Sequence, residues 1–141
     1  MTDSHPRIVA VDYGSRRVGL AISDPLQMFA QPLDTLPPAA SIERLVAVHT
    51  TQSLEAIVVG WPLTESGEEA EAIARVRPYI GRLKKALPDV RIETQDERYS
   101  SRRAVDGLVQ AGVGKKGRRD KARIDAAAAA VILQDYLDER G

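Results

Sequence analysis

The segment "RIVAVDYGSRRVGLAIS", residues 7–23, most constrains the fold of this chain. It contains two apolar runs of strand length, residues 8–12 and 17–23, joined by the short polar linker "YGSR". This pattern predicts a β-hairpin. Gly19 lies inside the second run and indicates either a bulge or a close approach by another part of the backbone. The first run ends on Asp12, which places a charge at the end of a strand that otherwise looks buried.

The rest of the chain predicts alternating helices and strands. Ser41 is the expected N-cap of the first helix, and Pro78 is expected to kink or split the second. Residues 54–59 are apolar on both faces, which is typical of a central parallel strand. The expected elements after the hairpin are a strand at 28–36, a helix at 41–51, a strand at 54–59, a helix at 66–87 (with Ser66 and Glu69 at capping-box spacing), a strand at 90–95 and helices at 101–111 and 121–139.

The resulting order, β-β-β-α-β-α-β-α-α, predicts an α/β fold. Three consecutive strands followed by alternating helices and strands favour a mixed five-stranded sheet with helices on both faces. The 141 residues fit one domain, 1–141, with no repeat and no second domain. Residues 1–6 are expected to be disordered.

Composition narrows the chemistry that a metal site could use. The chain has no cysteine and only two histidines, His5 and His49. Thiolate and histidine-rich metal sites are therefore excluded, and any metal would be held by carboxylates, the ligands preferred by Mg²⁺ or Mn²⁺. No apolar run is long enough to span a membrane, and the N-terminus does not resemble a signal peptide. We therefore expect a cytoplasmic protein with no membrane association.

A net charge of zero hides a basic segment between residues 98 and 123. Only Asp106 and Asp120 oppose its nine basic residues. Such a segment can bind phosphates, although a solvated loop between helices would look the same. The candidate nucleic-acid-binding residues are Arg98, Arg102, Lys115, Lys116, Arg118, Arg119 and Lys121.

Acidic residues fall at three expected element boundaries. Asp12 ends the first strand, Asp96 and Glu97 follow the last strand, and Asp125 lies in the first turns of the final helix. Sites in open α/β sheets lie beyond the carboxyl ends of the strands, so Asp12, Glu97 and Asp125 could share one crevice. Carboxylates so close together repel one another unless cations neutralise them. Two divalent ions there could clamp a phosphodiester during in-line displacement.

Each acid also has a purely structural interpretation. Asp12 could form an Asx-turn, Glu97 could pair with Arg98 or Arg102, and Asp125 could complement the helix N-terminus. A different function is also compatible with the hairpin, because sugar kinases, actin and Hsp70-type ATPases wrap ATP phosphates with a similar strand-turn-strand. Those proteins need two such domains, and this chain supplies one.

Four stretches, in order, resemble the YqgF (RuvX) family, which is RNase H-like and related to Holliday junction resolvases. They are "AVDYGSRRVGLAISD", "VVGWPLTESGEE", "DERYSSRRA" and "KARIDAAAAAVILQDYL". The resemblance implies an RNase H-like fold and a metal-dependent endonuclease that leaves a 5′-phosphate. Members are described either as nucleases that process the 5′ end of pre-16S rRNA or as resolvases of branched DNA. We favour RNA as the substrate and keep branched DNA as the alternative.

The resemblance implies that Asp12, Glu97 and Asp125 are the catalytic metal ligands, with Asp96 a lesser candidate. Lys121, one helical turn before Asp125, could hold the substrate phosphate. A resolvase should be a twofold dimer, whereas an rRNA nuclease could be a monomer or a homodimer. A non-catalytic binding module that kept the fold is a further alternative.

The chain departs from the commonest family pattern at Trp61, Tyr99, Ala126 and Ala128. The two aromatic residues could stack on an unpaired base or simply pack in the protein.

Overall fold

The computed structural model describes residues 5–61, 68–96 and 121–140. Its centre is a five-stranded sheet in the order β3-β2-β1-β4-β5. This confirms the expected number of strands, and the first strand lies at the centre of the sheet. The strands are β1 (Arg7–Asp12), β2 (Val18–Ser23), β3 (Ala30–Leu36), β4 (Leu54–Trp61) and β5 (Arg91–Asp96).

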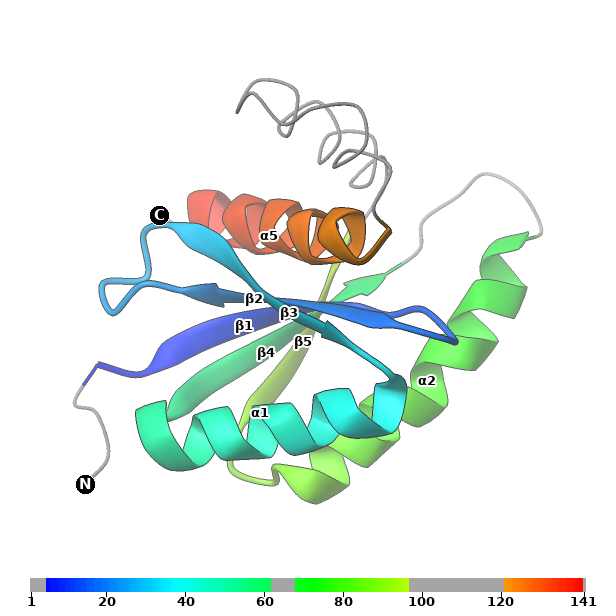
Figure 1. Ribbon diagram of the computed structural model, residues 1–141, viewed down its shortest axis with the longest axis horizontal. Coiled ribbons are helices and arrows are strands. Elements are labelled where there is room, and N and C mark those ends of the chain that lie inside the picture. The colour runs from blue at the N-terminus through cyan, green and yellow to red at the C-terminus, as the bar shows by residue number, and fades with distance from the viewer. Residues whose placement is uncertain (1–4, 62–67, 97–120, 141) are drawn as a thin grey trace.

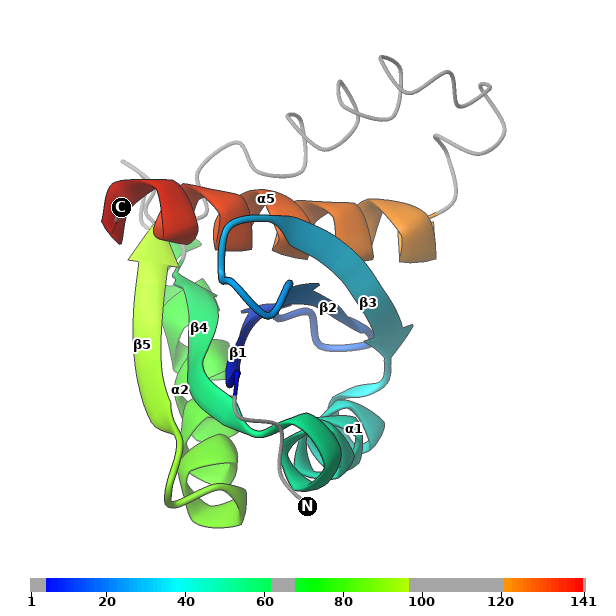
Figure 2. The same cartoon turned by 90° about the vertical axis from the view of Figure 1, so that its left-hand side faces the viewer.

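Among the described residues, three helices cover the two faces of the sheet. They are α1 (Pro38–Gln52), α2 (Glu68–Ala86) and α5 (Lys121–Arg140). Figures 1 and 2 show α5 on one face, and α1 and α2 together on the other. The α/β class with helices on both faces is thereby confirmed, while the predicted helix at 101–111 lies outside the described residues.

The strand pairing makes the sheet mixed, as predicted. β1 pairs antiparallel with β2 and parallel with β4. β2 and β3 are antiparallel, whereas β4 and β5 are parallel. The first two strands form the expected hairpin, and the carboxyl ends of β1, β4 and β5 meet at one edge of the sheet.

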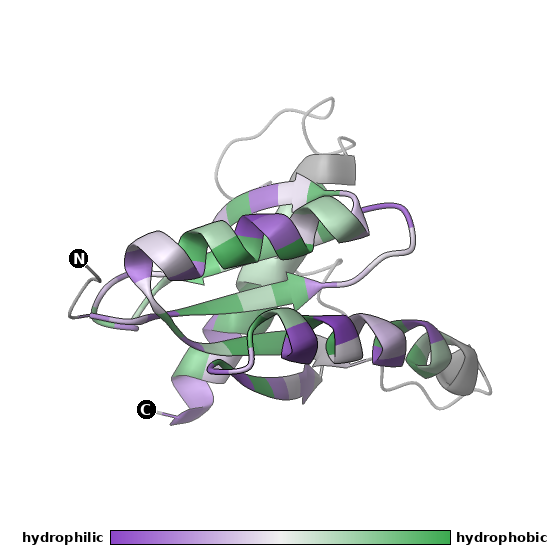
Figure 3. Ribbon diagram, turned by 90° about the horizontal axis from the view of Figure 1, so that it is seen from below, coloured by the Kyte–Doolittle hydropathy of each residue, from purple (hydrophilic) through white to green (hydrophobic). Residues whose placement is uncertain are grey.

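Alternation along the strands creates two cores. Val9 and Val11 face α1 and α2, where they join a cluster that includes Tyr79; Figure 3 views this side of the molecule, with the hydrophobic strands between the two helices. Ile8 and Ala10 point the other way and pack in the cluster that contains the apolar residues of α5. β1 is therefore buried on both faces, so the face that each of its side chains occupies follows from its position in the sequence.

The first helix begins earlier than the sequence predicted. It starts at Pro38, and Pro37 is the N-cap residue with no side-chain hydrogen bond. Proline suits the first helical position because its fixed φ fits a helix and its missing N–H has no partner there in any case. Ser41 lies within the first turn instead, where its hydroxyl donates to the Pro38 carbonyl (2.6 Å) and bonds to the Tyr79 hydroxyl (2.8 Å). Burial raises the pKa of Tyr79 to about 12.

Pro78 does not split the second helix, because α2 continues through it from Glu68 to Ala86. The predicted cap at Ser66 lies outside the described residues. So do residues 1–4, whereas the carbonyl of Pro6 accepts a hydrogen bond from the Gln27 side chain at 3.0 Å. No helix among the described residues is long and apolar enough to cross a membrane.

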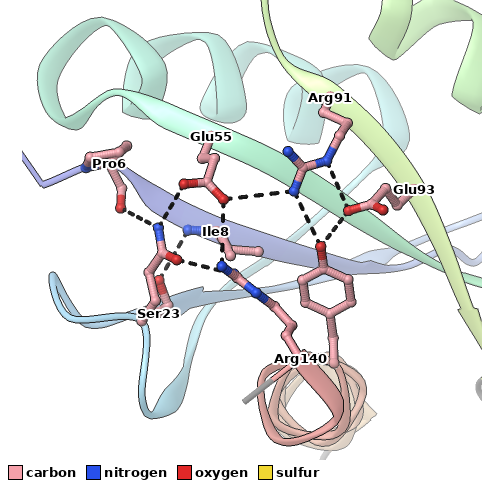
Figure 4. Close-up of polar contacts among 9 residues, drawn as sticks. Pro6, Ile8, Ser23, Glu55, Arg91, Glu93 and Arg140 are labelled. Carbon is pink, nitrogen blue, oxygen red and sulfur yellow. Dashed lines mark hydrogen bonds and ion pairs between the residues drawn. The ribbon is translucent and has the colours of Figure 1, made fainter.

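A polar network joins the C-terminal half of α5 to the amino-terminal ends of strands β4 and β5 (Figure 4). The Tyr136 hydroxyl donates a short hydrogen bond to Glu93. Arg91 bonds to both, through its Nε to Glu93 at 3.0 Å and its Nη2 to Tyr136 at 3.3 Å. Arg140 approaches Glu55 at 3.8 Å. These contacts hold one end of α5 against the sheet, opposite the end that carries Asp125.

We expect Tyr136→Phe to lower the free energy of unfolding by about 1 kcal/mol at neutral pH. The substitution removes the hydrogen bond to the Glu93 carboxylate, and the contribution of such a bond is reduced here because both side chains are partly exposed to solvent. The Tyr136 hydroxyl is the main cause of the lowered pKa of Glu93. A lowered carboxyl pKa stabilises the fold above the unfolded pKa, and this stabilisation is lost as pH falls through the folded one. Denaturant titrations should therefore show the two proteins converging as the pH falls below the ordinary glutamate pKa of about 4.3. A difference that stays constant with pH would contradict this assignment.

Candidate active site

Asp12 points to the α5 face of the sheet. Side chains alternate between the two faces of a strand, so Asp12 lies on the same face as Ile8 and Ala10, which pack with α5. Its neighbour Tyr13 lies on the opposite side, where its ring is 4.9 Å from that of Tyr79 on α2. The anchored aromatic ring and the buried strand together fix the direction of the Asp12 side chain, which is half-buried.

Gly19 brings α5 up to this position. It is the register partner of Asp12 on β2. A Cβ atom on Gly19 would lie 2.1 Å from the carbonyl oxygen of Asp125 and 3.0 Å from the backbone nitrogen of Ala126. The helix backbone thus rests directly on the strand backbone, which confirms the close approach that the glycine indicated. The small residues Ala126 and Ala128 are buried in the same helix and permit this contact.

Asp12 and Asp125 therefore lie near each other. Paired antiparallel residues have Cα atoms about 5 Å apart, so the Asp12 and Asp125 Cα atoms lie within about 10 Å of each other once the helix contact is added. Carboxylates at that spacing can reach a common cation. The contact between Gly19 and the backbone of Asp125 is what brings these two residues near each other.

Arg17 is a member of the site that sequence reasoning missed. Its Nε lies 3.2 Å from Oδ2 of Asp125. The turn before β2 is tight, since a Cβ on Gly14 would be 2.6 Å from the Arg17 carbonyl. The sequence did contain a signal for Arg17. Arg17 lies two residues before Gly19, and so it lies at the same end of β2 as the contact between Gly19 and α5.

A second glycine lies on the other side of Asp12. Val11 of β1 pairs with Val59 of β4, so Asp12 and Gly60 are the next residues at the ends of these two parallel strands. Gly60 in turn pairs with Gln95 on β5. Gly60 has the parity of Ala56 and Val58, which face α5, so Asp12 has a residue without a side chain on either flank of its face. On the Gly19 flank, the backbone of α5 fills the space that a side chain would take.

Several predicted residues cannot be placed. Glu97 lies outside the described residues, as do Arg98, Arg102, Lys115, Lys116, Arg118 and Arg119. Asp96 is described through its backbone, which pairs with Trp61, and Lys121 through its position as the first residue of α5. Within the described ranges, no three acids, histidines or cysteines gather as a metal site.

The donor set of this site fits a hard divalent cation. Asp12 and Asp125 offer only carboxylate oxygens, which suit Mg²⁺ or Mn²⁺. Two like charges near one another are costly, and Arg17 offsets part of that cost by pairing with one of them. Neither acid is fully buried, so a hydrated ion could enter.

Comparison with known proteins identifies relatives along almost the whole chain. The family model RuvX, described as Holliday junction resolvase, matches residues 6–139. A protein of Salinibacter ruber is 48% identical over 138 residues, covering 98% of this chain and 96% of its own. One from Chlorobaculum tepidum is 42% identical over 137 residues, covering 97% and 96%. Both carry the provisional name pre-16S rRNA nuclease.

Two solved structures of Thermus thermophilus RuvC share the fold. One, in complex with a Holliday junction substrate, superposes with a TM-score of 0.63 at 17% identity and covers 96% of both chains. The other has a TM-score of 0.53 at 18% identity and covers 95% of both chains. At this identity the likeness concerns the fold alone, and it agrees with the RNase H-like architecture expected from the sequence.

Proposed function

Because this chain belongs to the RuvX family, we propose that it is a divalent-metal-dependent nuclease that hydrolyses phosphodiester bonds in the precursor of 16S rRNA. The observation that carries the proposal is the convergence of Asp12 and Asp125 across Gly19. The provisional name shared by relatives at 48% and 42% identity supports the RNA substrate. An enzyme with that substrate would work in the cytoplasm, where ribosomes are assembled.

In this proposal Asp12, Glu97 and Asp125 hold the metal. Bound Mg²⁺ or Mn²⁺ would activate the attacking water and stabilise charge on the scissile phosphate. Asp12 is the central ligand, because the buried strand fixes its direction. We include Glu97 because the stretch "DERYSSRRA" that contains it is one of the four that resemble the family. Asp96, beside it, remains the lesser candidate.

The cations of the chain would position the polyanionic substrate. Arg17 lies at the carboxylates and could contact the phosphate that is cut, and Lys121, at the start of α5, could do the same. Contacts to flanking phosphates would orient the substrate without reading its sequence. The residues proposed for them are Arg98, Arg102, Lys115, Lys116, Arg118 and Arg119.

A cleavage assay with two substrates tests the proposal. Labelled single-stranded RNA that spans the 5′ end of 16S rRNA and a labelled four-way DNA junction would each be incubated with Mg²⁺, Mn²⁺ or EDTA. We expect metal-dependent cutting of the RNA. If neither substrate is cut with either metal, the proposed activity is wrong.

Resolution of branched DNA is the second candidate. The description of the matching family as Holliday junction resolvase favours it. A resolvase cuts two strands symmetrically and so should be a twofold dimer. Symmetric cutting of the junction alone, by a protein that sedimentation shows to be dimeric, would replace the rRNA assignment. A monomer that cuts RNA would exclude this candidate.

We expect Arg17→Gln to change the free energy of unfolding by less than about 1 kcal/mol without metal, since partly exposed ion pairs contribute little. Arg17 is 42% and Asp125 28% exposed. With the guanidinium gone, the carboxylates should gain more from a divalent ion. Addition of Mg²⁺ should therefore raise the melting temperature of Arg17→Gln more than that of the wild type. Equal shifts in a thermal melt would show that Arg17 does not compete with the cation.

A further inference from the structure

A groove opens on the opposite face of the sheet from α5, between β5 and α2. Its volume is about 330 Å³. Trp61 and Thr94 lie at its end near the carboxyl edge of the sheet, and Ile92 lies deeper along β5. The lining residues are Trp61, Arg77, Ile80, Gly81, Lys84, Ile92 and Thr94; we call this the Trp61 groove.

The lining combines an aromatic ring with two cations and no acid. The guanidinium carbon of Arg77 lies 5.8 Å from the centroid of the Trp61 ring. Arg77, Gly81 and Lys84 are four and three positions apart on α2, so they lie along one stripe of the helix. The Cα atoms of Arg77 and Lys84 are about 10 Å apart along the helix axis. The groove therefore suits a ligand with a flat apolar part and negative charges at both ends.

Gly81 keeps the groove open at a cost to the helix. Glycine in a helix interior is about 0.5–1 kcal/mol less favourable than alanine. No atom lies within 4 Å of the position that a Cβ on Gly81 would occupy. Packing therefore does not require glycine here, unlike at Gly19. Larger residues would be tolerated and would occupy the space in front of Trp61.

The groove begins next to the candidate active site. Trp61 directly follows Gly60, which lies beside Asp12 at the ends of the adjacent strands β4 and β1. Neighbouring strands are about 4.8 Å apart. A nucleic-acid strand held at Asp12 could thus pass over the edge of the sheet into the groove.

We propose that the Trp61 groove binds an unpaired nucleotide of the substrate strand, with its base against Trp61 and its phosphates near Arg77 and Lys84. Stacking on an aromatic ring is open to every base that is not paired within a duplex. The groove would therefore select single-stranded over double-stranded nucleic acid. This inference rests on the proposed nuclease function and adds the strandedness of its substrate.

Trp61 is the only tryptophan of the chain, so its fluorescence reports on the groove alone. In EDTA, which prevents cleavage, a short labelled single-stranded RNA would be titrated, with anisotropy measuring total binding. We expect binding to quench the tryptophan emission. A duplex of the same length should bind without quenching. Binding of the single strand with no change in emission would overturn the proposal.

Two substitutions at Gly81 provide a matched pair. Gly81→Leu should fill the groove and weaken single-strand binding by about 10-fold, the scale of one lost base–aromatic stack. Gly81→Ala should bind as the wild type does, since it adds one methyl group in open space. Both replace glycine by a better helix former, so the fold should be retained. Equal affinity of the two variants would overturn the proposal.

The outcome is distinct from that of the nuclease proposal. Quenching by single strands in a protein that cuts no substrate would support the groove and refute the proposed function. Metal-dependent cleavage without quenching would support the function and refute the groove.

Discussion

Asp12→Asn and Asp125→Asn should each lower the rate of metal-dependent RNA cleavage by at least about 100-fold, because a metal ion supplies several kcal/mol of transition-state stabilisation. An amide is a neutral and weaker ligand for a hard cation than a carboxylate. Asp12 is the more sensitive position, since the buried strand β1 leaves its side chain few alternative directions. Initial rates at saturating Mg²⁺ would measure the loss.

The fold should survive both substitutions. Removing one of two neighbouring negative charges relieves repulsion, and the ion pair lost at Asp125 is partly exposed. The melting temperature without metal should therefore change little. This separates a loss of activity from a loss of structure.

Asp34→Asn is a suitable control. Asp34 also lies in a strand and forms an ion pair with Arg44 at 3.7 Å. Its register partner on β2 is Leu20, so it does not lie opposite a residue of the candidate site. Its cleavage rate should equal that of the wild type. If Asp12→Asn cuts as fast as Asp34→Asn, the acids are turn caps and ion-pair partners, and the metal-site assignment is wrong.

Gly19→Ala should destabilise the protein by about 3 kcal/mol or more, at or beyond the upper end of the range for overpacking a core. The added Cβ would lie 2.1 Å from the carbonyl oxygen and 2.4 Å from the carbonyl carbon of Asp125. Both are backbone atoms, so no side chain can rotate away to make room. The N-terminal part of α5 would have to lift from β2, which would carry Asp125 away from Asp12. Cleavage activity should fall together with stability.

Gly81→Ala is the matched control for this change. It also adds one methyl group to a glycine inside a regular element, but in open space. It should raise the free energy of unfolding by up to about 1 kcal/mol through helix propensity. Denaturant unfolding of the two variants would thus give shifts of opposite sign. A mild effect of Gly19→Ala would mean that α5 does not rest on the backbone of β2.

Much of the fold could be predicted because its signals are local. Alternating and continuous apolar runs identified all five strands and their mixed arrangement. The sequence also predicted helices at the positions of α1, α2 and α5. The start of α1 was wrong by three residues. A serine before an apolar run looks like a cap, whereas Pro38 already satisfies the first turn and Ser41 is used to bond Tyr79.

Two facts about the site were also implied by sequence. Asp12 was expected to end a buried strand, and Gly19 was expected to mark either a bulge or a close approach, because both follow from residue type and strand position. The resemblance in four ordered stretches supplied the family, and the match over residues 6–139 confirmed it.

Only the tertiary structure decided which element approaches Gly19 and which cation joins the acids. The contact between Gly19 and Asp125 joins segments far apart in the chain, and it depends on how α5 lies across β1 and β2. The Arg17–Asp125 pair and the open space before Gly81 arise in the same way. Residue type and local period determine what an element is and which face is buried. The distances between side chains of different elements depend on how those faces pack, which no local pattern encodes.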